Sequence, residues 1–138
     1  MDNESLTHTK WRCQYHIVFI PKYRRKKMWG AVRTDLVEII KTLCDYKHVK
    51  ITAGAVMPDH VHLCVELSTK YSVSSFMGYL KGKSALMIFD KHPEFKQRGD
   101  KEFWARGYYV STVGNVNEET IQNYIREKEN SDQMDASK

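Results

Sequence analysis

Two histidines separated by one residue have the spacing in this sequence that most directly suggests chemistry. His60 and His62 stand within the run PDHVHLCV, whose apolar residues indicate a β-strand. Side chains alternate along a strand, so both imidazoles would leave the same face with their Cα atoms about 7 Å apart. Two nitrogens so placed can bind one divalent cation and leave positions for water and a phosphate oxygen. A bare His-x-His pair is also typical of core histidines, and the two residues alone leave both interpretations open.

A tyrosine near the C-terminus is the second candidate for chemistry. Tyr124 lies in the run IQNYIR, on a predicted helix. A tyrosine hydroxyl can attack a phosphodiester, which leaves a covalent phosphotyrosine and a free 3′-hydroxyl. It needs a nearby metal or cation to help it ionise. Ile121, Tyr124 and Ile125 also have the spacing of an ordinary core stripe, so the residues alone do not select Tyr124 over Tyr108 or Tyr109.

Positive charge is concentrated in short clusters along the chain. The formal net charge is +5, and residues 22–27 alone carry five cations. Such clusters favour a polyanion through counterion release, although basic runs are equally typical of solvated surface. Charge therefore suggests nucleic acid without establishing it. The candidate phosphate contacts are Lys22, Arg24, Arg25, Lys81 and Lys83.

The composition is that of a globular protein. Hydrophobic residues make up 41% and charged residues 28%, which argues against disorder. The longest apolar run, residues 17–20, is far too short to span a membrane, and the acidic N-terminus does not resemble a signal peptide. Three scattered cysteines without CxxC spacing indicate reduced thiols. We therefore expect a cytoplasmic protein without a membrane partner.

A soft zinc site built from the same strand is the weaker interpretation of the histidines. Cys64 would continue the face that carries His60 and His62. One flat strand cannot place three ligands around a tetrahedral ion, so we rank this site low.

The elements that must position these residues follow from the hydrophobic periodicity. Strands are predicted at residues 13–20, 49–56, 60–67 and 108–113, and helices at 31–46 and 72–90 and after residue 117. Ser72 and Asn117 are the expected N-caps of the last two helices. The order predicts a single α+β domain of the ferredoxin-like or RRM-like kind, an antiparallel sheet with helices packed on one face. Residues 130–138 are polar enough for a flexible tail.

Four sequence blocks, taken in order, resemble the single-tyrosine HUH transposases of bacterial insertion sequences, the TnpA-type or IS200-like family. They are WRCQYHIVFIPKYRR at residues 11–25, PDHVH at 58–62, SVSSFMGYLKGKS at 72–84 and FWARGYYV at 103–110. The likeness runs from residue 10 to about residue 129. A histidine pair alone is weak, but four such blocks in order are highly specific.

The resemblance implies a metal-dependent DNA transposase in a single domain spanning residues 1–138. The family's histidine–hydrophobic–histidine motif falls on His60, Val61 and His62, which would hold Mg²⁺ or Mn²⁺. Its nucleophile falls on Tyr124, which would form a covalent 5′-phosphotyrosine while single-stranded DNA is cut and rejoined at insertion-sequence ends. The implied partners are single strands with hairpin ends and a second copy of the chain. In that homodimer, the tyrosine helix of one subunit completes the histidine site of the other, in a bacterial or archaeal cell.

One position departs from the family's pattern. The third metal ligand is typically a Gln or similar polar group four residues after the nucleophile, and here that residue is Lys128. An ammonium has no lone pair to donate, although Glu127 could substitute. The departure favours an alternative function, a catalytically impaired or recruited relative that still binds hairpins. A sheet-based RNA binder of the RRM kind shares the layout, but the chain lacks an aromatic-rich RNP1-like run.

Overall fold

The computed structural model describes residues 12–22, 27–97, 101–112 and 117–136. Its elements are, in chain order, β1 (Arg12–Phe19), α1 (Gly30–Tyr46), β2 (Lys50–Met57), β3 (His60–Ser68), α2 (Val73–Lys91), α3 (Glu94–Gln97), β4 (Tyr109–Ser111) and α4 (Glu118–Ala136). The predicted order of strands and helices is confirmed, with the short helix α3 as an addition. Both predicted caps form, because the Ser75 N–H donates to Ser72 Oγ and the Thr120 N–H donates to Asn117 Oδ1.

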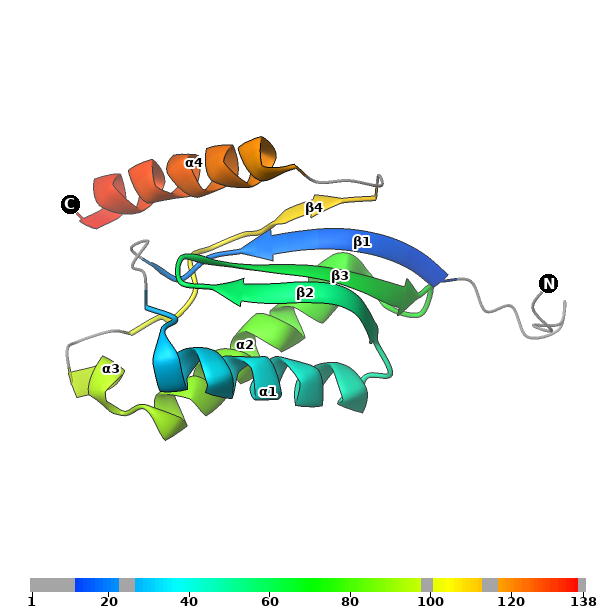
Figure 1. Cartoon of the computed structure of the whole chain (residues 1–138), viewed down its shortest axis with the longest axis horizontal. Helices are drawn as coiled ribbons and strands as arrows, with labels where there is room; N and C mark the ends of the chain where they lie inside the picture. Colours follow the sequence, from blue (N-terminus) through cyan, green and yellow to red (C-terminus); the bar gives the residue numbers. More distant parts are fainter. Residues whose placement is uncertain (1–11, 23–26, 98–100, 113–116, 137–138) are drawn as a thin grey trace, which may run out of the picture.

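The four strands form one antiparallel sheet in the order β2-β3-β1-β4 (Figure 1). β2 and β3 are joined by a short turn, and Met57 pairs with His60 where the hairpin closes. β1 lies in the middle and pairs with both β3 and β4. This strand order and the βαββαβ succession confirm the predicted ferredoxin-like α+β fold.

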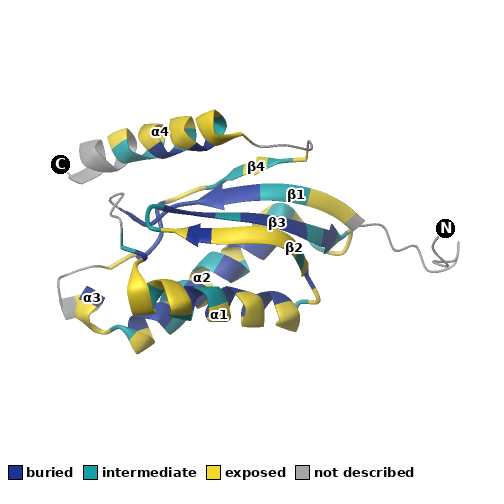
Figure 2. Ribbon diagram, viewed as in Figure 1, coloured by how far each residue is buried: buried dark blue, intermediate teal, exposed yellow. Residues whose placement is uncertain are grey.

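The main core fills the space between one face of the sheet and the helices α1 and α2. Alternate residues of the two central strands point into it, among them Ile17, Phe19, Val61 and Leu63. The apolar stripes of the two helices face them, including Leu36, Ile40, Phe76 and Leu80. Each such side chain, once fully buried, contributes on the order of 1.5–3 kcal/mol of transfer free energy. Figure 2 shows the same division, with buried residues along β3 and on the sides of α1 and α2 that face the sheet.

Helix α4 lies across the other face of the sheet, so the prediction that the helices pack on one face is wrong for this element (Figure 1). Val18, Ile20 and Ala105 form a second buried cluster there with Ile121 and Ile125 of α4. The reason is the sequence of β1, in which apolar residues occupy both alternating sets. A central strand that is apolar on both faces needs cover on both sides.

The C-terminal part of α4 overlaps the segment, residues 130–138, for which the sequence predicts a flexible tail. The helical backbone continues to Ala136. This segment is polar, yet it holds no glycine or proline, the two residues that disfavour a helix most, and it contains the good helix formers Gln133, Met134 and Ala136. Polarity excludes a buried face and does not by itself end a helix. No helix among the described residues is both long enough and apolar enough to cross a membrane.

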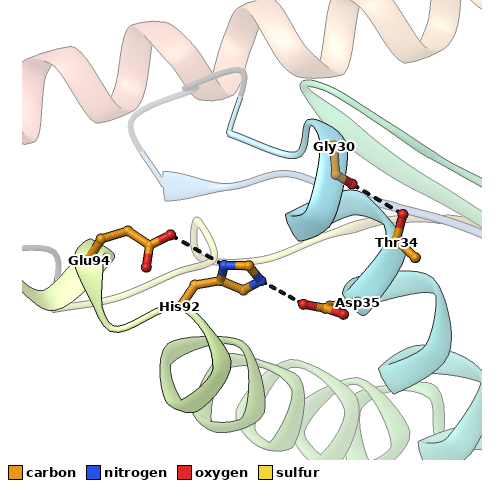
Figure 3. Close-up of polar contacts among 5 residues, drawn as sticks. All are labelled: Gly30, Thr34, Asp35, His92 and Glu94. Atoms are coloured by element: carbon orange, nitrogen blue, oxygen red, sulfur yellow. Dashed lines mark hydrogen bonds and ion pairs between the residues drawn. The ribbon is translucent and has the colours of Figure 1, made fainter.

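His92, at the C-terminal end of α2, contacts acidic residues of both α1 and α3 (Figure 3). Its Nε2 lies 2.7 Å from Asp35 Oδ2 on α1, and its Nδ1 lies 3.2 Å from Glu94 Oε2 on α3. Both ring nitrogens of this histidine therefore have carboxylate partners, and the residue has a structural role in the helical layer.

Candidate active site

The histidine pair lies on the sheet face that α4 also covers. Val61, Leu63 and Val65 of β3 point into the main core, so the alternating residues His60, His62 and Cys64 point to the opposite face. The cross-strand neighbours of His62 are Ala55 on β2 and Val18 on β1. The sheet therefore places both imidazoles on one face, as their spacing predicts.

His60 is held by the residue immediately before it. Its Nδ1 lies 2.8 Å from Asp59 Oδ1, and the residue as a whole is only 7% exposed. An ionised carboxylate only accepts hydrogen bonds, so Nδ1 carries the proton and Nε2 keeps its lone pair. A carboxylate in this position orients a metal-binding imidazole and raises its basicity.

His62 is kept in its neutral form by its surroundings. Burial lowers the pKa of His62 below its usual value, and the positive charges that His16 and His60 would carry lower it further. The His62 Nε2 is shielded from solvent and has no hydrogen-bond partner in the described part of the chain. A neutral imidazole with an unshared nitrogen is the form that binds a metal ion.

His16, which the sequence did not single out, is a neighbour of His62. It lies on β1, and the centroids of the two rings are 5.6 Å apart. Its Nδ1 is also shielded and lacks a hydrogen-bond partner among the described residues. The predicted strand periodicity could have revealed it, because His16 alternates with Ile17 and so faces away from the core.

The histidines fit the divalent cation that the family resemblance implies, although their arrangement is incomplete. The orphaned Nε2 of His62 and the carboxylate-oriented ring of His60 are suitable donors. Within the described ranges, no three His, Cys, Asp or Glu side chains are gathered closely enough to hold a metal ion. Cys64 instead accepts a hydrogen bond at its Sγ from Gln14 Nε2, at 3.3 Å.

Tyr124 reaches the same face of the sheet from helix α4. It packs against the second apolar cluster, and its ring centroid lies 6.2 Å from that of Tyr109 on β4. Tyr109 pairs with Val18, and Val18 pairs in turn with His62. Tyr124 and the histidines therefore share one face, with the tyrosine over β1 and β4 and the histidine pair on β3.

The predicted phosphate contacts are found in different surroundings. Arg24 and Arg25 lie outside the described residues. Lys22 is buried, and its Nζ lies 3.8 Å from Glu102 Oε2. Lys83 is exposed on α2.

Lys81 is engaged with the backbone of the segment that precedes β4. Its ammonium donates to the carbonyl oxygens of Ala105 and Gly107 at 2.7 and 2.8 Å. Burial and the nearby charge of Lys128 lower the pKa of Lys81 to about 8. Gly107 has a φ of +78°, and a Cβ added to it would lie 3.3 Å from Lys128 Nζ. The ammonium of Lys128 is thus found beside Gly107 in this chain.

Comparisons with known proteins agree with this arrangement. The family described as "Transposase IS200 like" matches residues 9–128. The transposase for insertion sequence element IS200 of Salmonella typhimurium is 49% identical over 135 residues, which covers 96% of this chain and 88% of the relative. The ISDra2 transposase TnpA of Deinococcus radiodurans is 29% identical over 116 residues and is matched over 83% of both chains.

Two solved structures are similar in fold. A crystal structure of a candidate transposase from Deinococcus radiodurans R1 aligns with a TM-score of 0.81 at 29% identity, over 93% of this chain and 98% of the other. A REP-associated tyrosine transposase bound to a REP hairpin aligns with a TM-score of 0.56 over 92% of this chain and 68% of the other, and at 16% identity this likeness shows the fold alone. With its sequence matched over most of its length and its fold in agreement, the chain belongs to the IS200-like family of transposases.

Proposed function

We propose that this transposase cuts and rejoins single-stranded DNA at insertion-sequence ends, with Tyr124 as the nucleophile and a divalent cation at His60 and His62. The observation that carries the proposal is the placement of these three side chains on one face of the sheet. A nucleophile and a pair of metal-binding imidazoles are the groups that a phosphodiester transfer of this kind needs.

Cleavage is a transesterification at phosphorus. The Tyr124 Oη attacks the scissile phosphate, and the bond from phosphorus to the 3′ oxygen breaks. The tyrosine loses its proton to solvent, and the released 3′ oxygen takes one up. The product is a 5′-phosphotyrosine, which conserves the energy of the broken bond, so a different 3′-hydroxyl can reverse the step and join two strands.

The cation would be held by the Nε2 atoms of His60 and His62. Mg²⁺ or Mn²⁺ in this position would polarise the scissile phosphate and offset the charge that develops on it. Asp59 keeps the Nε2 lone pair of His60 available by accepting the Nδ1 proton. Burial and the neighbouring imidazoles keep His62 neutral.

The DNA partner is a hairpin with a single-stranded flank. The hairpin-bound REP-associated transposase shares this fold, which supports a hairpin as the ligand here. Lys83 is exposed and available to a phosphate, and Arg24 and Arg25 supply further charge from a basic segment of the sequence. Lys22 and Lys81 already have protein partners. They therefore contribute to DNA binding mainly through the positive electrostatic potential of the surface.

The active form is a homodimer in which each subunit lends its tyrosine helix to the histidine site of the other. The contact of α4 with the sheet supports an exchange of this kind. Ile121 and Ile125 of the helix are buried, with Tyr124 packed beside them. An identical sheet in a second subunit offers the same docking surface.

A covalent adduct tests the proposed reaction. A 3′-labelled single-stranded oligonucleotide that carries the element's end should become attached to the protein when Mn²⁺ is added. Tyr124→Phe should abolish the labelled band and keep hairpin binding. Tyr109→Phe is the matched control, because it keeps the ring contact with Tyr124 and should leave the adduct intact. An adduct on the Tyr124→Phe protein would assign the nucleophile to another residue.

A second candidate function is a hairpin-binding relative that no longer cleaves. Lys128, which stands where the family has a metal-binding polar group, is the observation that favours it. Tight hairpin binding by a wild-type protein that forms no adduct at any Mg²⁺ or Mn²⁺ concentration would support this function over the first.

A further inference from the structure

An exposed tryptophan stands at the start of helix α1. Trp29 is the N-cap residue of this helix and is 59% exposed, although tryptophan carries a large ring that proteins bury for the most part. Its exposed neighbours along the helix, Gly30, Ala31 and Arg33, are small or charged. A single exposed ring among such residues suits a flat ligand better than a broad protein surface.

The stability of α1 does not explain a tryptophan at this position. An N-cap is preferably Ser, Thr, Asp or Asn, and Ser72 and Asn117 fill this role in α2 and α4. Trp29 makes no side-chain hydrogen bond to the first turn of its helix. A residue that cannot cap typically costs a helix stability compared with serine, so Trp29 calls for a role outside the helix.

The backbone beside Trp29 is attached to the turn that carries the histidine site. The Met28 N–H donates to the Pro58 carbonyl at 3.3 Å, and the Met28 side chain is buried. Pro58 precedes Asp59, which orients His60. The start of α1 and the β2–β3 turn lie at the same end of the molecule (Figure 1). A DNA strand bound at the histidines can therefore extend to Trp29.

Positive charge occurs on both sides of Trp29 in the sequence. The basic segment at residues 22–27 ends two residues before it, and Arg33 follows about one helical turn later. The Arg33 Nε donates to the Val56 carbonyl at 2.8 Å, which fixes the guanidinium near the end of β2. A guanidinium held through Nε can still present its Nη atoms to a phosphate. An aromatic ring flanked by cations is the arrangement with which proteins bind single-stranded nucleic acid.

We infer that Trp29 stacks on a base of the single-stranded DNA flank and that Arg33 binds an adjacent phosphate. The inference rests on the proposed function, because it concerns the strand that the histidine site would cleave. It adds a base-binding subsite outside the histidine pair and the tyrosine. Stacking on an aromatic ring depends little on the identity of the base, so the subsite holds the strand without reading its sequence.

Fluorescence anisotropy of a labelled oligothymidine, with the full chain and no added metal, tests the subsite. Trp29→Ala should weaken affinity roughly 5- to 150-fold, the range that stacking on one base contributes. Tyr46→Ala removes an exposed ring from the other end of α1, so this matched control should bind like the wild type. Arg33→Gln should lower the slope of log affinity against log salt by about one.

Intrinsic fluorescence provides a second readout, because a base that stacks on an indole quenches its emission. Trp104 is buried against Phe19 and Phe103, which shield it from a bound base. Trp29→Phe keeps a ring for stacking and removes the emitting indole. This variant should therefore retain most of the oligothymidine affinity and lose most of the quenching.

Trp29→Ser separates DNA binding from a role in the fold. Serine supplies the side-chain cap that α1 lacks, so the urea midpoint of this variant should not fall. Its affinity for oligothymidine should nevertheless drop as it does in Trp29→Ala. A lowered urea midpoint together with wild-type DNA affinity would assign Trp29 a structural role and overturn the inference.

The outcomes separate this inference from the proposed function. Wild-type oligothymidine affinity in folded Trp29→Ala, with normal formation of the Tyr124 adduct, would overturn only the base-binding subsite. A wild type that binds no single-stranded DNA would overturn both the inference and the proposed function. Affinity that depends on Trp29, in a protein that forms no adduct, would support the subsite and overturn the proposed reaction.

Discussion

At the scale of single residues, the candidate site depends on the surroundings of its two imidazoles. Burial and mutual repulsion lower the pKa of His62, and the carboxylate of Asp59 fixes the proton of His60 on Nδ1. Burial and neighbouring charge act on His62, whereas a hydrogen bond to Asp59 orients His60. Each imidazole would bind an ion through its Nε2.

Replacing Asp59 should weaken metal binding without unfolding the chain. Asp59→Asn still offers an oxygen to the His60 Nδ1 but loses the negative charge that makes the ring more basic. We expect Mn²⁺ affinity to fall roughly 10- to 100-fold. Calorimetric titration measures it, with Asp45→Asn, an exposed substitution on α1, as the control. Unchanged Mn²⁺ affinity would mean that Asp59 contributes only to the turn between β2 and β3 and not to metal binding.

The lowered pKa of His62 should also be visible in the pH dependence of stability. Because the folded state disfavours its protonation, the unfolded chain binds more protons, and stability rises with pH in that range. The contribution of neutral His62 to the free energy of unfolding is present above the unfolded pKa of about 6.5, and it is lost as pH falls below that value. The urea midpoint of the wild type should therefore drop more steeply between pH 7.5 and 5 than that of His62→Gln. Parallel curves for the two proteins would contradict this.

At the scale of elements, the local patterns predicted most of the fold. The periodicities of α1, α2 and β3 and the caps Ser72 and Asn117 depend on neighbours in sequence, so they could be recognised from the sequence. The face that α4 covers depends on which strands lie in the centre of the sheet. This strand order is set by contacts between distant parts of the chain, so local sequence patterns do not reveal it. For the same reason the ring contact between His16 and His62, and the hydrogen bonds from Lys81 to Ala105 and Gly107, could not be predicted from spacing.

The contact between α4 and the segment before β4 contains a repulsion that can be removed. Lys128 helps to lower the pKa of Lys81 to about 8, after the larger effect of burial. Lys128→Gln should raise the pKa of Lys81, which ¹⁵N chemical shifts of the ammonium can follow. A lysine whose pKa is lowered by folding reduces the stability of the folded state as pH falls from about 10.5 towards 8. The free energy of unfolding of Lys128→Gln should therefore depend less on pH in that range than that of the wild type. Lys83→Gln, an exposed change on the same helix as Lys81, should alter neither quantity.

The same substitution tests position 128 in the reaction. If the α4 helix docks on the sheet of a partner, an ammonium one turn beyond Tyr124 would repel a divalent ion nearby. Lys128→Gln should therefore raise both metal affinity and cleavage rate. Equal rates and equal metal midpoints across a Mn²⁺ titration would show that position 128 plays no part.

At the scale of the whole molecule, a net charge of +5 predicts salt-sensitive DNA binding. If the basic clusters meet about six phosphates, affinity should fall on the order of a thousandfold between 50 and 200 mM salt. Lys83→Gln should reduce the slope of log affinity against log salt by about one. Lys41→Gln, an exposed change on α1 at a residue that is not one of the candidate phosphate contacts, should leave it unchanged. A flat salt response in the wild type would identify the clusters as solvated surface.

The two-sided apolar character of β1 has a consequence for stoichiometry. Val18 and Ile20 are covered by α4 in this chain, and a sheet whose α4 helix departs would leave them in water. A helix that moves to a partner must therefore be replaced by the partner's own, so the two sites of a dimer are completed together or not at all. Mixing the full-length protein with a chain that ends before α4 should yield no half-active dimers, because each hybrid would carry one bare sheet. Such reciprocity would link cutting at one end of an element to the presence of a second intact copy.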